Sequence, residues 1–148
     1  MKIYIGADHN GFNIKRQIID YLTSLNHQVV DAGDKILNPS DDFPKFAAQV
    51  VDKLLGSKDQ DARGMLVCGS GQGMCMAANR FKRIRASLCW NTKEAFDSRN
   101  DDDSNILCLS SSQLSVAQMK QIINVWLNTP FAGSPRFVRR LKQLDSLG

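Results

Sequence analysis

The stretch GMLVCGSGQGMCMAAN, from Gly64 to Asn79, decides the fold, because a buried strand passes there into a glycine-rich turn and then a helix. Residues 65–67 form a short apolar run typical of a buried strand, and the glycines that follow let the backbone turn tightly beside a ligand. The segment Met74–Arg80 is predicted to be helical. Cys68 therefore stands where a predicted strand ends and a turn begins.

The position of Cys68 predicts a reactive thiol. The positive end of a helix dipole and unpaired backbone N–H groups favour both a thiolate and a developing oxyanion. Cys68 is thus a candidate base or nucleophile. Taken alone the loop is weak evidence: a buried strand-end thiol would then be the favoured interpretation of Cys68, and a simple tight turn would explain the glycines. CGSGQG also fits neither the dinucleotide fingerprint nor the P-loop, which needs a lysine after its final glycine.

Strand and helix patterns alternate on both sides of this stretch. Ile3–Ile5 are predicted to form the first strand, and apolar residues from Ile14 to Leu25 then recur at helical spacing before a strand around Val29. Three strands are expected further on, around Leu66 and at 86–89 and 105–109, with helices after Pro44, at 93–99 and 116–126, and a basic helix at 136–145. The pattern predicts a single-domain, doubly wound (Rossmann-like) α/β fold with about five parallel strands and helices on both faces.

Ligands of such folds bind at the carboxyl ends of the strands. Three polar loops, Asp8–Gly11, Cys68–Gly71 and Arg99–Asp103, are expected to leave the strands at this edge. We expect them to form one site, and their agreement carries more weight than any one motif.

Length, composition and charge limit the classes of ligand that the chain is expected to bind. A chain of 148 residues, 43% of them hydrophobic, is the size of one domain and can bury a core. The net charge of +4 is spread out except for Arg136, Arg139, Arg140 and Lys142. A small anionic substrate explains this cluster as well as a nucleic acid does, and nucleic-acid binding has little support because no aromatic stacking platform accompanies the cluster.

The cysteines predict free thiols in a reducing compartment. None of the four belongs to a CxxC pair, and only His9 and His27 could join them as metal ligands, so no structural metal site is expected. The first residues reach acidic and glycine residues too early for a signal peptide, and no apolar run approaches transmembrane length. We expect a cytoplasmic protein without membrane association.

Several separated motifs resemble one family, that of ribose-5-phosphate isomerase type B and its galactose-6-phosphate isomerase relatives. They are GADHNGFNIK (6–15), DFP (42–44), CGSGQGMCMAANRFKRIRASLC (68–89), SNILCL (104–109) and RFVRR (136–140). The resemblance spans nearly the whole chain. It implies an aldose–ketose sugar-phosphate isomerase that needs no cofactor or metal, and a homodimer, or a dimer of dimers, with active sites between subunits.

The resemblance also implies the roles of the glycine-rich turn. Cys68 matches the base that moves a proton between C2 and C1 through a cis-enediolate, and Ser70 matches a hydroxyl that assists the sugar oxygens. Gly69, Gly71 and Gly73 would bring backbone N–H groups close to the enediolate. A related branch has a glutamate where this chain has Met74, which leaves Cys68 as the base candidate of the turn.

The remaining matched residues bind substrate. Asp8 corresponds to an acceptor of sugar hydroxyls, and His9 to a residue near the phosphate or the ring oxygen, although a polar residue at a helix entry would look the same. Arg136 and Arg140 match a phosphate-binding pair, and their i, i+4 spacing places both on one helix face. A solvated basic helix is the alternative for this pair. Arg85 and Asn79 also match family positions. We expect Arg85 to be structural and assign no role to Asn79.

The chain departs from the family pattern in the ring-opening loop. Asp101 and Asp102 stand where the family usually has a His-Asn pair whose histidine opens the sugar ring. We hypothesise that Asp101, coupled to Asp102 and Asp103, takes over ring opening, because adjacent carboxyl groups raise one another's pKa. An acidic, solvated loop that caps a helix is the competing interpretation.

Two further departures concern substrate binding. Ser112 replaces an arginine that usually binds phosphate, and Phe43 replaces a tyrosine. The sequence therefore predicts an isomerase of ribose 5-phosphate with two alternatives. One is an isomerase of another aldose phosphate, such as a hexose 6-phosphate of the galactose type, and the other is a sugar-phosphate-binding relative that lost catalysis.

Overall fold

The computed structural model describes residues 1–148. Five strands alternate with helices as far as α5, and α6 follows α5 directly. In chain order the elements are β1 (Lys2–Ala7), α1 (Phe12–Ser24), β2 (Gln28–Asp31), α2 (Phe43–Leu55), β3 (Arg63–Cys68), α3 (Gln72–Ala78), β4 (Ala86–Leu88), α4 (Thr92–Asn100), β5 (Ile106–Ser110), α5 (Val116–Asn128) and α6 (Pro135–Asp145).

The strands form one parallel sheet in the order β2-β1-β3-β5-β4. Ala7 of β1 pairs with Val67 of β3, and Cys68 pairs with Ser110 of β5, so the carboxyl ends of these three strands lie side by side. The chain winds outward from β1 to β2 and then returns to β3 on the other side of β1. This reversal makes the β1/β3 edge the topological switch point, where doubly wound folds bind ligands.

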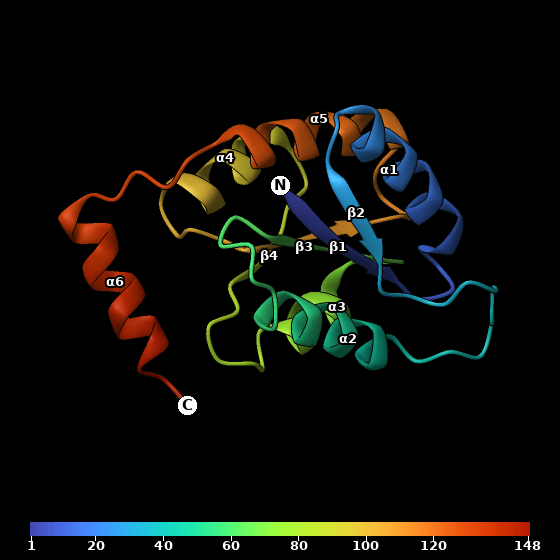
Figure 1. Cartoon of the computed structure of the whole chain (residues 1–148), viewed down its shortest axis with the longest axis horizontal. Helices are drawn as coiled ribbons and strands as arrows, with labels where there is room; N and C mark the ends of the chain where they lie inside the picture. The colour runs from blue at the N-terminus through green and yellow to red at the C-terminus, as the bar shows by residue number, and fades with distance from the viewer.

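Helices cover both faces of the sheet, with α1, α4 and α5 on one face and α2 and α3 on the other (Figure 1). The first face buries aliphatic side chains of α1 and α5 around Trp126, whose indole Nε1–H donates to Ser104 Oγ at 2.8 Å. The second face packs Phe46 and Val50 of α2 against Leu66 of β3. Side chains of each strand alternate between the two layers, as pleated strands require. The expected α/β fold is confirmed.

Local sequence signals fix the helix ends. Ser115 and Gln118 form a reciprocal capping box at the start of α5, and Asn91 Oδ1 accepts the Glu94 N–H at the start of α4. The glycine turn ends in a helix that starts earlier than predicted, at Gln72 rather than Met74, and stops at Ala78. The left-handed backbone of Gly71, with φ of 79°, makes this earlier start possible.

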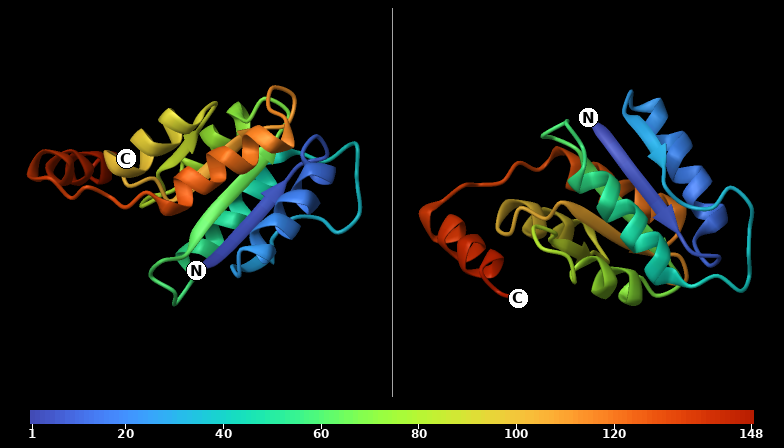
Figure 2. Two further views of the ribbon diagram at one scale, coloured as in Figure 1. Left: turned by 90° about the horizontal axis from the view of Figure 1, so that it is seen from above. Right: turned by 60° about the horizontal axis from the view of Figure 1, so that its bottom comes forward.

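Helix α6 differs from the other helices because none of its residues is buried. It projects away from the sheet beside β4 and α4, and only its C-terminal end turns back toward the body (Figure 2). Its one ion pair with the body joins Asp145 to Arg85 at 3.7 Å. No helix of the chain combines the length and the apolar character needed to cross a bilayer.

Candidate active site

The Cys68 thiol lies at the carboxyl end of β3 and is 5% exposed. The backbone N–H of Gly71 donates to its Sγ at 3.1 Å, as expected for a thiol enclosed by the turn. Burial nevertheless raises the pKa of Cys68; N–H groups of Met74 and Gly71 lower it by less, and the charge of Asp8 adds to the rise. The N–H groups of the turn favour the thiolate as predicted, but the sequence did not show the larger opposing effect of burial, so the net pKa of Cys68 is raised.

Close packing requires two of the three glycines of the turn, Gly71 and Gly73. A Cβ at Gly71 would lie 2.5 Å from Leu88 Cδ1 in a backbone conformation that side chains rarely adopt. A Cβ at Gly73 would lie 2.8 Å from the Phe43 ring, so this glycine lets the start of α2 pack on the turn. Gly69 faces the side chain of Asn10 at ordinary contact distance. Packing thus explains Gly73 without a ligand.

A serine turn after β5 holds the glycine turn in place. From the sequence, this turn was noted only because Ser112 replaces a phosphate-binding arginine. Ser110 Oγ and Ser112 Oγ donate to the Gly69 carbonyl at 2.6 and 2.8 Å. Ser111 Oγ lies 2.9 Å from the Asn10 carbonyl and 3.1 Å from that of Cys68. Ser112 is thus a structural support of the Cys68 loop. The run of three serines at the end of a strand is the sequence signal that could have revealed this support, but the sequence analysis did not use it.

The loop after β1 brings Asp8 to the same edge. The residue is 6% exposed, and its carboxylate accepts the N–H groups of Asn10 and Gly11 at 3.0 and 3.3 Å. Burial raises its pKa, against the lowering effect of these two hydrogen bonds. Asp8 therefore sits beside Cys68 as a partly desolvated carboxyl group with a fixed orientation. Ser70, by contrast, is exposed, and its Oγ accepts the Gln72 N–H at 3.2 Å.

His9 has a partner that sequence reasoning missed. Its Nδ1 lies 2.7 Å from Oδ1 of Asp41, and the same oxygen accepts the His9 backbone N–H at 3.0 Å. The hydrogen bond to Asp41 raises the pKa of His9, and the charge of Asp8 adds to the rise. Asp41 lies 32 residues away in the long loop before α2, so no local pattern links it to His9.

The Asp101–Asp103 segment lies at the amino ends of the strands, whereas Cys68 lies at their carboxyl ends. It follows the C-terminus of α4 and leads into the start of β5, where Ile106 pairs with Gly64. Cys68 lies four positions after Gly64 in β3, which is about 13 Å along the strand. The expectation that this loop leaves the carboxyl end of a strand is wrong. Within one chain Asp101 and Asp102 do not join the Cys68 site.

The three aspartates differ in their surroundings. Asp103 is paired with Arg85 at 2.9 Å and with Arg99 at 2.8 Å, so its charge has a structural role. Burial and then the neighbouring charge of Asp101 raise the pKa of Asp102, while Arg140 and Arg85 lower it. The hypothesis of a raised carboxyl pKa in this loop therefore holds for Asp102. Asp101 Oδ1 accepts a hydrogen bond from Asn100 Nδ2 at 2.7 Å.

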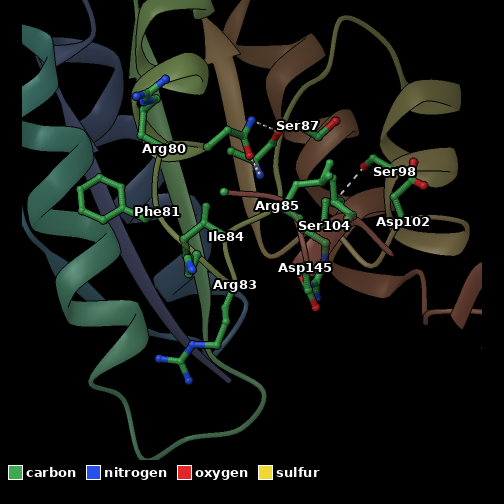
Figure 3. Close-up of a pocket in the computed structure, with 16 residues that line it drawn as sticks. Arg80, Phe81, Arg83, Ile84, Arg85, Ser87, Ser98, Asp102, Ser104 and Asp145 are labelled. Atoms are coloured by element: carbon green, nitrogen blue, oxygen red, sulfur yellow. Dashed lines mark hydrogen bonds and ion pairs between the residues drawn. The ribbon is translucent and has the colours of Figure 1, made fainter. Parts of the chain in front are cut away.

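Arg136 and Arg140 lie on α6, at the same distant edge as Asp102. A pocket of about 670 Å³ opens there between the C-terminal end of α6 and the segment 79–87; Arg85, Asp102 and Asp145 line it (Figure 3). This pocket contains none of the residues around Cys68. The predicted site residues therefore fall into two groups, one at each end of the sheet.

Two further matched residues are structural. Asn79 bridges the backbone of Ala86 with both ends of its amide, at 2.9 and 2.8 Å, and so fixes the start of β4. Arg85 binds both the carbonyl and the carboxylate of Asp103. All four cysteines are free, and no three His, Cys, Asp or Glu side chains converge in a way that could hold a metal ion.

The fold and the edge around Cys68 define a doubly wound α/β protein with a buried thiol and a buried carboxyl group at the switch point. A family model described as Ribose/Galactose Isomerase matches residues 3–144, and the chain belongs to this family. A curated relative from Mycoplasma genitalium, named probable ribose-5-phosphate isomerase B, is 37% identical over 142 residues, which are 96% of this chain and 92% of the relative.

Solved structures agree with this assignment. Ribose-5-phosphate isomerase B from Clostridium thermocellum has a TM-score of 0.92 at 36% identity and covers 98% of this chain and 95% of its own. The enzyme from Mycoplasma genitalium with bound ribulose-5-phosphate has a TM-score of 0.92 at 36% identity, with coverages of 97% and 93%. The likeness therefore extends over essentially the whole of both chains.

We predict that alkylation distinguishes the thiols. Cys75 is half-buried, and a hydrogen bond with Cys108 lowers its pKa, whereas burial raises the pKa of Cys68. Iodoacetamide should therefore modify Cys75 before Cys68 at neutral pH, and the rate at Cys68 should keep rising with pH above the ordinary thiol range. Peptide mass spectrometry resolves the sites. Faster labelling of Cys68 at neutral pH would contradict this account of its burial.

We predict that the aspartates of this loop differ in their effect on stability. Asp103→Asn keeps the shape and tolerates the local φ of 47° but leaves Arg85 and Arg99 without their charged partner, so the free energy of unfolding should fall by about 2 kcal/mol. Asp101→Asn should change it by less than about 0.5 kcal/mol. Urea denaturation compares the two, and equal losses would show that Asp103 has no special structural role.

Proposed function

We propose that this chain interconverts ribose 5-phosphate and ribulose 5-phosphate, with Cys68 as the base. The observation that carries the proposal is the buried Cys68 thiol, which receives the Gly71 N–H and adjoins the buried Asp8 at the switch point. Membership of the Ribose/Galactose Isomerase family and the likeness to an isomerase bound to ribulose-5-phosphate support the substrate.

The reaction needs one group that removes and returns a proton on the same face of the sugar. After ring opening, the Cys68 thiolate takes the proton from C2, and electrons move onto O1 to form a cis-enediolate. The thiol then returns a proton to C1 while the O2 hydroxyl passes its proton to the negative O1, which completes the ketose and restores the thiolate. Ser70 and the N–H groups of the turn stabilise the negative oxygens during this transfer.

The raised pKa of Cys68 fits this role. Because its pKa is raised by burial, the Cys68 thiolate is a strong base once an acceptor has taken the thiol proton, and burial keeps water away from the enediolate. Asp8 accepts hydroxyl hydrogen bonds of the bound sugar. Because its carboxyl group is already held by two backbone N–H groups, binding requires little reorganisation.

A homodimer with shared active sites supplies the phosphate-binding residues. Arg136 and Arg140 lie on a helix without buried residues, far from Cys68 of their own chain. We infer that the α6 edge of one subunit covers the Cys68 edge of its partner, so that Arg136 and Arg140 bind the phosphate and Asp101 and Asp102 face the sugar there. Exposed apolar side chains support an interface, namely Met76, Trp90, Phe96 and Leu144.

A cytoplasmic location accompanies this function. The four cysteines are free, and a catalytic thiol that must cycle through its protonated form requires a reducing compartment. The substrate belongs to the class of small phosphorylated sugars, for which no nucleic-acid or membrane partner is needed.

A second substrate class remains a candidate because of Ser112. This residue donates to the Gly69 carbonyl in place of the arginine that the family pattern places there, so the site lacks one cation for the phosphate. A site with fewer phosphate contacts shifts recognition toward the sugar hydroxyls. Hexose 6-phosphates are therefore the competing substrates to test.

We predict that the purified protein turns over ribose 5-phosphate faster than hexose 6-phosphates, and that Cys68→Ala lowers kcat by about 10³-fold because the proton-transfer group is lost. Cys75→Ala, which removes a neighbouring thiol on α3, serves as the matched control and should retain activity. Ketose formation is followed by absorbance. Faster turnover of a hexose 6-phosphate would show that hexose phosphates are the substrates. Undiminished activity of Cys68→Ala would show that Cys68 is not the base.

A further inference from the structure

The Asp41–His9 pair is built as an acid–base dyad at the Cys68 edge. One oxygen of Asp41 binds both Nδ1 of His9 at 2.7 Å and its backbone N–H at 3.0 Å. The side chain of Asp41 is 7% exposed, whereas that of His9 is 32% exposed. The carboxylate is therefore a buried support, and the imidazole is open to a ligand.

The pairing determines which ring nitrogen is free. A carboxylate only accepts hydrogen bonds, so Nδ1 of His9 is protonated and donates the hydrogen bond that Asp41 accepts. No side chain or backbone group of the chain binds Nε2, which is therefore the atom available to a substrate. In acid–base dyads of this kind the carboxylate fixes the tautomer and stabilises the imidazolium, while the other nitrogen exchanges protons.

The dyad lies at the edge that carries the thiol. His9 stands between Asp8 and Asn10, and Ser111 Oγ bridges the carbonyls of Asn10 and Cys68. Asp8 and Asp41 are the charged groups that face the imidazole, and both favour its protonated form. An imidazolium at this edge is a proton donor within the range of neutral pH, which an ordinary carboxyl group is not.

We propose that His9 is the acid–base residue that opens the sugar ring and that Asp41 is its positioning residue. The inference rests on the proposed isomerase function. The His9 imidazolium gives its Nε2 proton to the ring oxygen as the bond from C1 to that oxygen breaks. The C1 hydroxyl becomes the aldehyde carbonyl, and its proton returns to Nε2, so the ring has opened with no net change in protons. This assigns to His9 the step that the sequence alone led us to assign to Asp101.

The two directions of the reaction separate ring opening from proton transfer. Ribose 5-phosphate is a cyclic hemiacetal, whereas ribulose 5-phosphate cannot form a five-membered ring because its C5 oxygen carries the phosphate. Exchange of the C1 hydrogen of ribulose 5-phosphate with deuterium from solvent therefore needs enolisation by Cys68 but no ring opening. Proton NMR in deuterium oxide measures this exchange on the full-length protein.

The test compares Asp41→Asn with Asp42→Asn, a neighbouring substitution on an exposed carboxylate for which no hydrogen bond to His9 exists. Asp41→Asn should lower kcat for ribose 5-phosphate by about 10²-fold while ribulose exchange falls by less than about 3-fold. His9→Asn should show the same split, which tests the proposal again should Asp41→Asn fold poorly. Asp42→Asn should match wild type in both reactions.

The pH profile gives an independent readout. Asp41 raises the pKa of His9, so the imidazolium persists to higher pH in wild type than in Asp41→Asn. The alkaline limb of kcat/KM for ribose 5-phosphate should therefore move to lower pH in this variant, while ribulose exchange shows no such shift. Equal losses of turnover and exchange, or unchanged turnover in Asp41→Asn, would overturn the assignment. Absence of both reactions in wild type would instead refute the isomerase proposal itself.

Discussion

Parallel pairing of β1, β3 and β5 is the constraint on which the site depends. The register of Ala7 with Val67 and of Cys68 with Ser110 brings three strand ends together, so that a carboxyl group, a thiol and a serine turn meet without any direct sequence contact. The serine hydroxyls then hold the Gly69 carbonyl, and Gly71 closes the turn over the thiol. A slip of one residue in this register would carry Cys68 to the other face of the sheet.

Burial gives the site its chemical character. The same desolvation raises the pKa values of Cys68 and Asp8, which are neighbours at the switch point. His9 is the opposite case, because it stays open to solvent and gains its proton affinity from Asp41. The edge therefore combines a thiol whose pKa is raised by burial with an imidazole whose pKa is raised by a carboxylate partner. Such a division between two titrating groups suits a reaction with an acid-catalysed and a base-catalysed step.

Local patterns predicted most of the fold, because apolar periodicity and glycine turns are properties of short segments. The strand predicted around Leu66 forms as Arg63–Cys68, and the helix predicted at 136–145 forms as Pro135–Asp145. The errors had two sources. Asp101 was placed beside Cys68 although a helix predicted at 93–99 precedes it and a strand predicted at 105–109 follows it, an order that puts a loop at the amino ends of parallel strands. The contact between His9 and Asp41 was missed because it joins residues 32 positions apart through a long loop.

Division of the site between two edges, and hence between two subunits, is the central claim. Complementation tests it most directly: Cys68→Ala and Arg140→Ala subunits are unfolded together and refolded as a mixture, so that heterodimers form. A shared site predicts that the mixture recovers about a quarter of wild-type activity, because half of the dimers are mixed and each then holds one intact site of two. A mixture that is no more active than its two components would show that Cys68 and Arg140 do not act in one site built from two subunits.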